Sequence, residues 1–206
     1  MINKIFSKVW KVKMKNYFYA MMSRMKNIYR WGLMRNTRKE NLSEHSLEVA
    51  QIAHALAIIG NKRFGKDYDI NYVATAAMYH DTSEIITGDM PTPIKYYNPE
   101  IKSAYKQIEA AAEVQLKNML PDDFKEEFDK IYAPDNDTNK LIKAADKISA
   151  LIKCMEELNM GNREFCVAKE TIDASIKELN LPEANVFLNE FLEGFSLTLD
   201  ELKADK

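Results

Sequence analysis

The chain has 206 residues, which is enough for one large domain or two small ones. Hydrophobic residues make up 46% and charged residues 29%, the usual balance of a soluble globular protein. The formal net charge of −2 gives no overall field that favours polymeric nucleic acid, and no apolar run is long enough to cross a bilayer. Two cysteines make no disulfide framework, so we expect a reduced, cytoplasmic setting and no membrane partner.

Residues 1–13 place apolar side chains at helical spacing, with lysines between them. Helices on membrane surfaces have this pattern, and so do short amphipathic helices that pack on a soluble domain. We favour a packed helix, or an upstream extension of a protein that begins at Met14. The lysines interrupt any apolar core, which argues against a secretory signal. We therefore expect an N-terminal extension, residues 1–13, and one domain, residues 14–206.

The next part of the chain predicts two helices and the loop between them. No strand-like alternation of useful length occurs in the sequence. Helical spacing predicts a first helix over Tyr17–Tyr29 that ends near Gly32, followed by a polar, basic loop over residues 33–42. Ser43 is the expected N-cap of the second helix, and Gly60 is expected to end it.

The remaining elements are also helices. Asp69 or Asn71 should cap a helix that leads into His80. Two prolines in Gly88–Pro93 fix φ and remove backbone donors, so we predict an ordered loop there and not a helix. Apolar stripes predict further helices over residues 101–119, 121–131, 141–158, 164–179 and 182–191. The sequence therefore predicts a single all-α domain.

A histidine and an aspartate, His80 and Asp81, stand side by side at the end of an apolar run. Adjacent residues on a regular helix point about 100° apart, so both can reach one ion only from a helix end or an irregular turn. His45, in the first turn of its helix, and Asp146, at the margin of an apolar stripe, are candidates for two further ligands. Taken alone, His45 is more readily a structural histidine than a ligand, and Asp146 could equally pair with a neighbouring lysine. His54 faces the opposite side of its helix from His45 and is expected to be packed or hydrogen-bonded.

Together these residues would offer two imidazoles and two carboxylates. Mixed nitrogen and oxygen donors suit Mn²⁺, Co²⁺, Fe²⁺ or Mg²⁺. Such an ion can lower the pKa of a bound water and hold a phosphate oxygen. The ligand set therefore favours hydrolysis of a phosphate ester.

Four segments in a fixed order carry a resemblance to a known family. They are Arg30–Asn36 (RWGLMRN), Glu40–Ser46 (ENLSEHS), Met78–Asp81 (MYHD) and Thr87–Tyr96 (TGDMPTPIKY). The separated His…His-Asp…Asp pattern is similar to that of the HD-domain metal-dependent phosphohydrolases, and the four segments resemble the YfbR-type 5′-deoxynucleotidases. The likeness runs from about Met14 to near the C-terminus.

The resemblance implies an all-α HD-domain helical bundle, one divalent metal ion such as Co²⁺, Mn²⁺ or Mg²⁺, and a homodimer. It implies hydrolysis of deoxyribonucleoside 5′-monophosphates to deoxynucleosides and phosphate, with broad tolerance of the base. The metal ligands that it implies are His45, His80, Asp81 and Asp146. Two of these, Asp81 and Asp146, would also lie against the substrate phosphate.

The resemblance also implies roles around the metal. Arg30 would hold the phosphate, Trp31 would form one wall of the sugar pocket, and Glu84 would orient or deprotonate the attacking water. The sugar pocket would be lined by Asp89, Met90, Pro91 and Thr92. The residue types suit these roles, because arginine binds phosphate with a two-pronged fork and a carboxylate can act as a general base.

Two other functions stay open on the sequence. An HD-type phosphodiesterase or nucleoside triphosphate hydrolase would need more basic residues near its phosphates, and Arg35, Arg38 and Lys95 could supply them. A non-catalytic helical scaffold with a structural metal is less favoured. Structural zinc sites are usually rich in sulfur, and neither cysteine belongs to a paired ligand motif.

Overall fold

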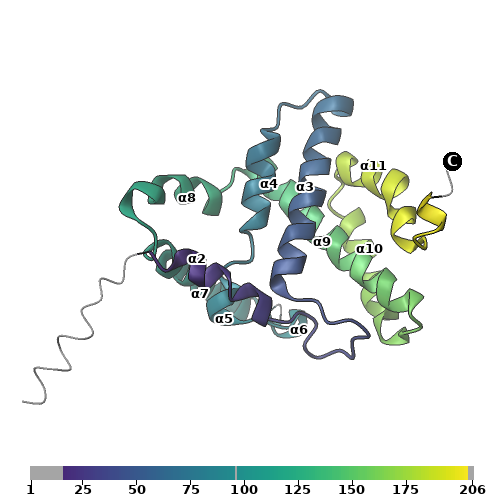
Figure 1. Ribbon diagram of the computed structural model, residues 1–206, viewed down its shortest axis with the longest axis horizontal. Helices are drawn as coiled ribbons and strands as arrows, with labels where there is room; N and C mark the ends of the chain where they lie inside the picture. The colour runs from purple at the N-terminus through teal and green to yellow at the C-terminus, as the bar shows by residue number, and fades with distance from the viewer. Residues whose placement is uncertain (1–15, 96, 204–206) are drawn as a thin grey trace, which may run out of the picture.

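The computed structural model describes residues 16–95 and 97–203, so the extension predicted for residues 1–13 lies outside the described residues. The described part is one all-α domain whose only β pairing is an isolated bridge between Tyr29 and Asn41. Figure 1 shows how its helices are arranged. They are α2 (Phe18–Met22), α3 (Leu42–Phe64), α4 (Ile70–Met78), α5 (Glu84–Thr87), α6 (Thr92–Lys95), α7 (Pro99–Lys117), α8 (Lys125–Tyr132), α9 (Asn136–Asn159), α10 (Cys166–Lys177) and α11 (Pro182–Phe191).

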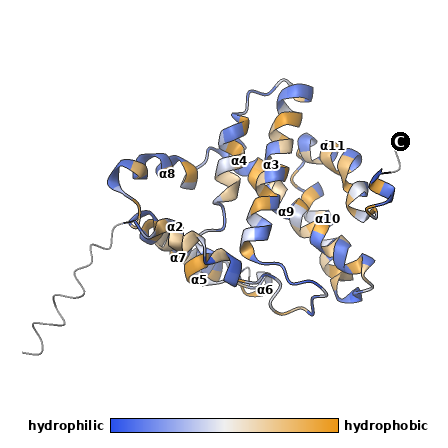
Figure 2. Cartoon of the chain, in the orientation of Figure 1, coloured by the Kyte–Doolittle hydropathy of each residue, from blue (hydrophilic) through white to orange (hydrophobic). Residues whose placement is uncertain are grey.

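Two long helices, α3 and α9, form the centre of the domain. Helix α3 packs against α4, α9 and α11, and α10 packs against the far part of α9 (Figure 1). The apolar stripes of these helices face one another, with Leu56, Ile148 and Leu151 almost fully buried. Along the longer helices hydrophobic and hydrophilic residues alternate in bands, as amphipathic helices require (Figure 2). A second, smaller core joins α2, α7 and α8 through Phe18, Leu116, Leu120 and Phe128.

The predicted first helix is wrong in its length. Helix α2 ends at Met22, a 3₁₀ turn follows over Met25–Asn27, and the backbone is extended at Ile28. Tertiary pairing explains the break, because the Ile28 carbonyl accepts a hydrogen bond from Leu42 N at 2.9 Å and Tyr29 bridges Asn41. This pairing sets the residues before the loop beside the start of α3.

Both predicted ends of α3 are also wrong. Asn41, not Ser43, is the N-cap, and the helix continues past Gly60 to Phe64, where Gly65 adopts a φ of 63° as the C-cap. Gly60 serves packing instead of termination. A Cβ at this position would lie 2.4 Å from the Tyr68 ring, so only glycine fits without displacing it.

Other helix boundaries differ from the predicted ones for local reasons. Asp135 accepts hydrogen bonds from the backbone of Asp137 and Thr138, so α9 begins at Asn136, earlier than predicted. The segment predicted as a loop contains helix α6 from Thr92, because proline is tolerated in a first helical turn. Asp69 caps α4, and α11 has the predicted bounds. None of the helices in the described residues is long and apolar enough to span a bilayer.

The polar loop runs between the two bridged residues, Tyr29 and Asn41. One buried carboxylate of α9, that of Glu157, holds this loop against the helix. Its oxygens accept hydrogen bonds from Thr37 N at 2.8 Å, Thr37 Oγ1 at 2.7 Å and Arg38 N at 3.2 Å. Lys153 and Asn162 donate to the same carboxylate. Burial alone would raise the pKa of Glu157, but the hydrogen bonds from Lys153, Asn162 and Thr37 outweigh it and hold the pKa well below its ordinary value. The loop therefore has a fixed course over α9.

We predict that Glu157→Gln lowers the free energy of unfolding by about 3–5 kcal/mol at pH 7, the cost of breaking a buried ion pair. Folding lowers the pKa of Glu157. Its contribution to the free energy of unfolding is therefore complete above the pKa of the unfolded state, near 4.5, and is lost as the pH falls through the pKa of the folded state. The difference between wild type and variant should therefore shrink in acid. Urea unfolding at pH 7 and below pH 4 measures it.

The matched control is Glu156→Gln, an exposed neighbour on the same helix, which should change stability by no more than about 0.5 kcal/mol. The role of Glu157 in holding the loop would be contradicted if both variants lost the same free energy of unfolding. It would also be contradicted if the loss in Glu157→Gln did not depend on pH.

Candidate active site

Helix α3 begins with a capping box that places His45 in its first turn. The Asn41 side chain accepts hydrogen bonds from Ser43 N at 3.0 Å and Glu44 N at 3.1 Å, and Glu44 Oε2 accepts one from Asn41 N at 3.0 Å. These bonds satisfy amide groups that a helix start leaves without partners. His45 then points inward and is almost fully buried.

Hydrogen bonds behind the His45 ring fix its orientation. The Nδ1 atom lies 3.0 Å from Ser149 Oγ, and Ser149 donates its one proton to Glu48 Oε2 at 2.6 Å. The serine oxygen therefore accepts from Nδ1, which leaves Nε2 to face the interior of the site. Sequence reasoning missed Ser149 and Glu48, because each has an ordinary position on its helix and neither belongs to a recognisable motif.

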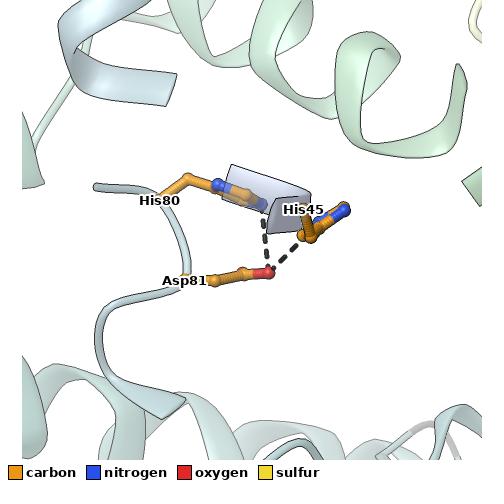
Figure 3. Close-up of side chains that lie close together, drawn as sticks. All are labelled: His45, His80 and Asp81. Carbon is orange, nitrogen blue, oxygen red and sulfur yellow. Dashed lines mark ion pairs between the residues drawn. The ribbon is translucent and has the colours of Figure 1, made fainter. Parts of the chain in front are cut away.

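His80 and Asp81 follow the end of α4, in the irregular turn that the adjacency of the two residues required. His80 Nδ1 donates to the carbonyl of Ala77 at 2.8 Å, which aims Nε2 at Asp81. The Asp81 Oδ2 atom lies 3.1 Å from His80 Nε2 and 3.6 Å from His45 Nε2, so both rings converge on one carboxylate (Figure 3).

Asp146 adjoins this cluster from α9. Its Oδ1 atom lies 3.2 Å from His45 Nε2 and 3.9 Å from Arg30 Nη2. Two of the lysines that could have paired with Asp146 have other partners, since Lys147 bonds Ser175 and Lys153 bonds Glu157. The structure thus brings His45, His80 and Asp81 together, and Asp146 adjoins them through His45. His54 is exposed on α3 and takes no part in the cluster.

The donor set of this cluster fits a divalent cation. Ligand atoms of His45, His80 and Asp81 lie within 4.8 Å of one another, as one ion requires. Within the described residues, Nε2 of His45 and Nε2 of His80 are buried and have no hydrogen-bond partner, a state that protein interiors seldom tolerate. Asp146 reaches the same region through His45.

The electrostatics of the cluster also favour a cation. Burial would raise the pKa of Asp81, but His80 and His45 hold it well below its ordinary value, and His45 likewise lowers the pKa of Asp146. Burial and Arg30 act to lower the pKa of His45, yet Asp146, Asp81 and Glu40 outweigh them and raise it to about 10. The two carboxylates are therefore anionic and draw positive charge to the point between the rings.

Arg30 lies beside this cluster with part of its guanidinium unused. Its backbone N donates to Glu40 O at 3.0 Å, next to the Tyr29–Asn41 bridge, and its side chain is only 13% exposed. The Nη1 atom is buried and has no hydrogen-bond partner among the described residues. An arginine fork with a free donor next to a metal cluster is suited to bind an anion such as phosphate.

Glu84 is the first residue of α5 and is buried. Its Oε2 atom lacks a hydrogen-bond partner in the described part of the chain. Burial, Asp81 and Asp89 together raise the pKa of Glu84 to about 9. Without a cation such a carboxyl holds its proton at neutral pH, and a cation bound at the cluster would favour the charged form that a general base needs.

A cavity of about 550 Å³ opens beside Arg30. It is lined by every residue predicted to contact the sugar, namely Trp31, Asp89, Met90, Pro91 and Thr92. Trp31 has a φ of 59°, which a tryptophan rarely adopts, and its Nε1 donates to Glu40 Oε2 at 3.1 Å. The opposite wall comes from Ala168, Thr171 and Ile172 of α10. Sequence reasoning missed these three, because nothing in the local pattern distinguishes them from other helix residues.

Comparison with known proteins identifies the family. The model of the YfbR-like 5′-deoxynucleotidase family matches residues 17–195. The chain belongs to this family. A 5′-deoxynucleotidase of Vibrio parahaemolyticus is 50% identical over 91% of this chain and 98% of its own length, and that of Vibrio cholerae is 49% identical over the same shares. Family membership makes the chain an enzyme, and a hydrolase.

Solved structures share the fold of this 5′-deoxynucleotidase family member. An HD-domain phosphohydrolase of Listeria innocua superposes with a TM-score of 0.72 at 23% identity, covering 90% of this chain and 91% of that one. The HD phosphohydrolase DatZ of cyanophage S-2L, solved with dA and one catalytic Zn²⁺ ion, has a TM-score of 0.63 at 20% identity, over 85% of this chain and 96% of its own. Both likenesses confirm the predicted HD-domain helical bundle.

We predict that adding Mn²⁺ or Co²⁺ to metal-free protein raises its thermal midpoint, because a ligand that binds only the folded state stabilises it by about 2.7 kcal/mol at 100 times Kd. His80→Ala should abolish most of this rise and the bound metal, as measured by thermal melting and elemental analysis. His54→Ala, on an exposed histidine, should keep both. A wild-type midpoint shift in His80→Ala would contradict the site.

Proposed function

We propose that the chain hydrolyses deoxyribonucleoside 5′-monophosphates to deoxynucleosides and phosphate, with a divalent metal ion. One observation carries this proposal: the Nε2 atoms of His45 and His80, which have no hydrogen-bond partner among the described residues, meet the Asp81 carboxylate beside the guanidinium of Arg30. The adjoining cavity of about 550 Å³ has room for a nucleoside. The names of the curated relatives support the same reaction.

The metal would be held by His45, His80, Asp81 and Asp146. When bound, a divalent ion supplies Lewis acidity, which lowers the pKa of water and polarises a phosphate oxygen. Nitrogen and oxygen donors rank Co²⁺, Mn²⁺ and Mg²⁺ closely, so we propose one ion from this group. Arg30 binds the phosphate and offsets the negative charge that develops on it.

Glu84 takes a proton from the attacking water. It lies one turn after Asp81 and its carboxylate is buried, and a cation at the cluster would favour the charged form that accepts a proton. The water oxygen forms a bond to phosphorus, the bond from phosphorus to the 5′-oxygen breaks, and the nucleoside departs. The proton that Glu84 accepts is passed to the departing 5′-oxygen, which leaves as the hydroxyl of the nucleoside.

The sugar end of the substrate would lie between Trp31 and the segment Asp89–Thr92. The backbone of Trp31 lies near enough to Asp89 to act on the pKa of its carboxyl group, so the two walls are close together. The Asp89 carboxylate can accept a hydrogen bond from the 3′-hydroxyl, while Pro91 limits movement of the segment. We propose that this closed wall leaves the 2′-position without a partner and so favours deoxyribose.

The charge around the cavity supports a monophosphate over a triphosphate. Arg30 is the one cationic residue among the described residues that line it. Arg35 is 96% exposed in its side chain, Arg38 lines a different cavity, and Lys95 pairs with Glu109 at 2.7 Å. The extra basic residues that a nucleoside triphosphate hydrolase or phosphodiesterase would use are therefore directed elsewhere.

Family membership also supports proposals on the state of the protein in the cell. We propose a homodimer in the cytoplasm, with residues 14–206 as the catalytic domain and residues 1–13 as an extension. Polymeric nucleic acid is not an expected partner, as the net charge of −2 indicates.

We predict inorganic phosphate release from deoxyribonucleoside 5′-monophosphates of all four bases in the presence of Co²⁺, Mn²⁺ or Mg²⁺. Ribonucleotides should be poorer substrates by up to about 10²-fold, the limit for rejecting one hydroxyl by shape. A phosphate assay with product analysis measures both. Phosphate from neither set, or pyrophosphate or triphosphate released from deoxynucleoside triphosphates, would contradict the proposal.

We predict that Glu84→Gln lowers kcat about 10²- to 10⁴-fold, the range for losing a general base. The metal content should stay at the wild-type level, because Glu84 is not a proposed ligand. Glu126→Gln, on a carboxylate whose side chain is 86% exposed, is the matched control and should keep full turnover. An unchanged rate in Glu84→Gln would assign water activation to another group.

A further inference from the structure

One carboxylate outside the cavity, Glu40, contacts three groups of the active site. Its Oε1 atom lies 3.5 Å from Arg30 Nη1 and 3.5 Å from His45 Nδ1. Its Oε2 atom accepts the hydrogen bond from Trp31 Nε1 at 3.1 Å. Arg30 is proposed to bind the phosphate, His45 to bind the metal, and Trp31 to line the sugar pocket. The inference therefore rests on the proposed function.

Backbone pairing places Glu40 at this junction. The Glu40 carbonyl accepts from Arg30 N at 3.0 Å, directly beside the Tyr29–Asn41 bridge, and the next residue, Asn41, caps α3. The loop thus leaves at Arg30 and returns at Glu40. The left-handed backbone of Trp31, at a φ of 59°, turns its side chain so that the indole can reach the returning carboxylate.

Glu40 lies behind the active site and not in it. Among the described residues that line the cavity of about 550 Å³, Arg30 and Trp31 are present and Glu40 is absent. Glu40 instead lines a separate cavity of about 240 Å³, together with Glu44 and Glu48. Its carboxylate therefore does not face the position of the substrate.

The distances indicate how Glu40 acts on Arg30. The guanidinium is 13% exposed, so it needs a nearby negative charge to remain in place. The 3.5 Å separation provides that charge, and Nη1 makes no hydrogen bond to any of the described residues. The other nearby carboxylate, Asp146, is 3.9 Å away and already faces His45.

We propose that Glu40 is a positioning residue that holds Arg30 and Trp31 in register with His45. Its charge keeps the arginine fork aimed at the phosphate, and its second oxygen fixes the indole that walls the sugar. The phosphate and sugar subsites are thereby set relative to the metal cluster by a single side chain. The expected consequence is weaker phosphate binding without loss of metal when the charge is removed.

The test measures binding of inorganic phosphate to metal-loaded protein by calorimetry, so it does not require turnover. Glu40→Gln keeps the shape and an acceptor for Trp31 but removes the charge, and it should weaken phosphate binding about 5- to 50-fold, the range of coupling between contacting residues. Metal content should be unchanged. Glu44→Gln, the same substitution in the first turn of α3, should bind phosphate as wild type does.

A double-mutant cycle separates positioning from a general structural effect. In an Arg30→Gln background, adding Glu40→Gln should weaken phosphate binding no further, because Glu40 acts through Arg30. A second full loss in that background would overturn the proposal. So would a Glu40→Gln affinity equal to that of Glu44→Gln, or loss of metal in Glu40→Gln.

Glu40→Asp keeps the test decisive if Glu40→Gln does not fold. The shorter side chain retains the charge but withdraws it from Arg30 and Trp31, so an intermediate loss of phosphate affinity is expected, and wild-type affinity would overturn the proposal. Should wild type bind phosphate but release none from deoxynucleotides, the proposed function fails while the comparison of Glu40 variants still stands.

Discussion

The structure depends on two imidazole nitrogens and a carboxylate that are held together in the interior without mutual hydrogen bonds. Nε2 of His45 and Nε2 of His80 are buried, have no hydrogen-bond partner in the part of the chain that the structure describes, and are directed at Asp81. Burying unsatisfied polar atoms costs free energy, so folding must supply it from the α3, α4 and α9 packing that surrounds the cluster. A bound cation would recover that cost, which links metal affinity to the stability of the helices that carry the ligands.

The second constraint is the loop from Arg30 to Asn41, which brings the substrate-binding groups to the cluster. It is fixed at its outer part by Glu157 on α9 and at its return by the pairing next to Glu40. A rigid loop lowers the entropy lost on binding, because its side chains are already ordered before the substrate arrives. The metal cluster and the phosphate-binding arginine are therefore positioned by different elements that meet at the start of α3.

Much of the fold could be predicted from the sequence, because amphipathic periodicity determines which segments are helical. The bounds of α11 agreed, and the all-α class was confirmed. The errors arose where tertiary contacts override local signals. Gly60 suggests a helix end in the sequence, but glycine is needed there because the Tyr68 ring packs against it. Ile28 is extended because it pairs with Leu42. The four proposed ligands were predicted from residue type and motif order. The role of Glu40 was not predicted. It arises because the loop folds back and places Glu40 beside Arg30, and no periodic pattern in the sequence encodes that.

The most direct test is a crystal structure of the protein grown with Mn²⁺ and a non-hydrolysable deoxynucleotide analogue, with the ion located by its anomalous scattering. The account predicts one ion within about 2.0–2.4 Å of His45 Nε2, His80 Nε2 and carboxylate oxygens of Asp81 and Asp146. The analogue phosphate should contact Arg30. An ion elsewhere, or a phosphate remote from these residues, would contradict the account.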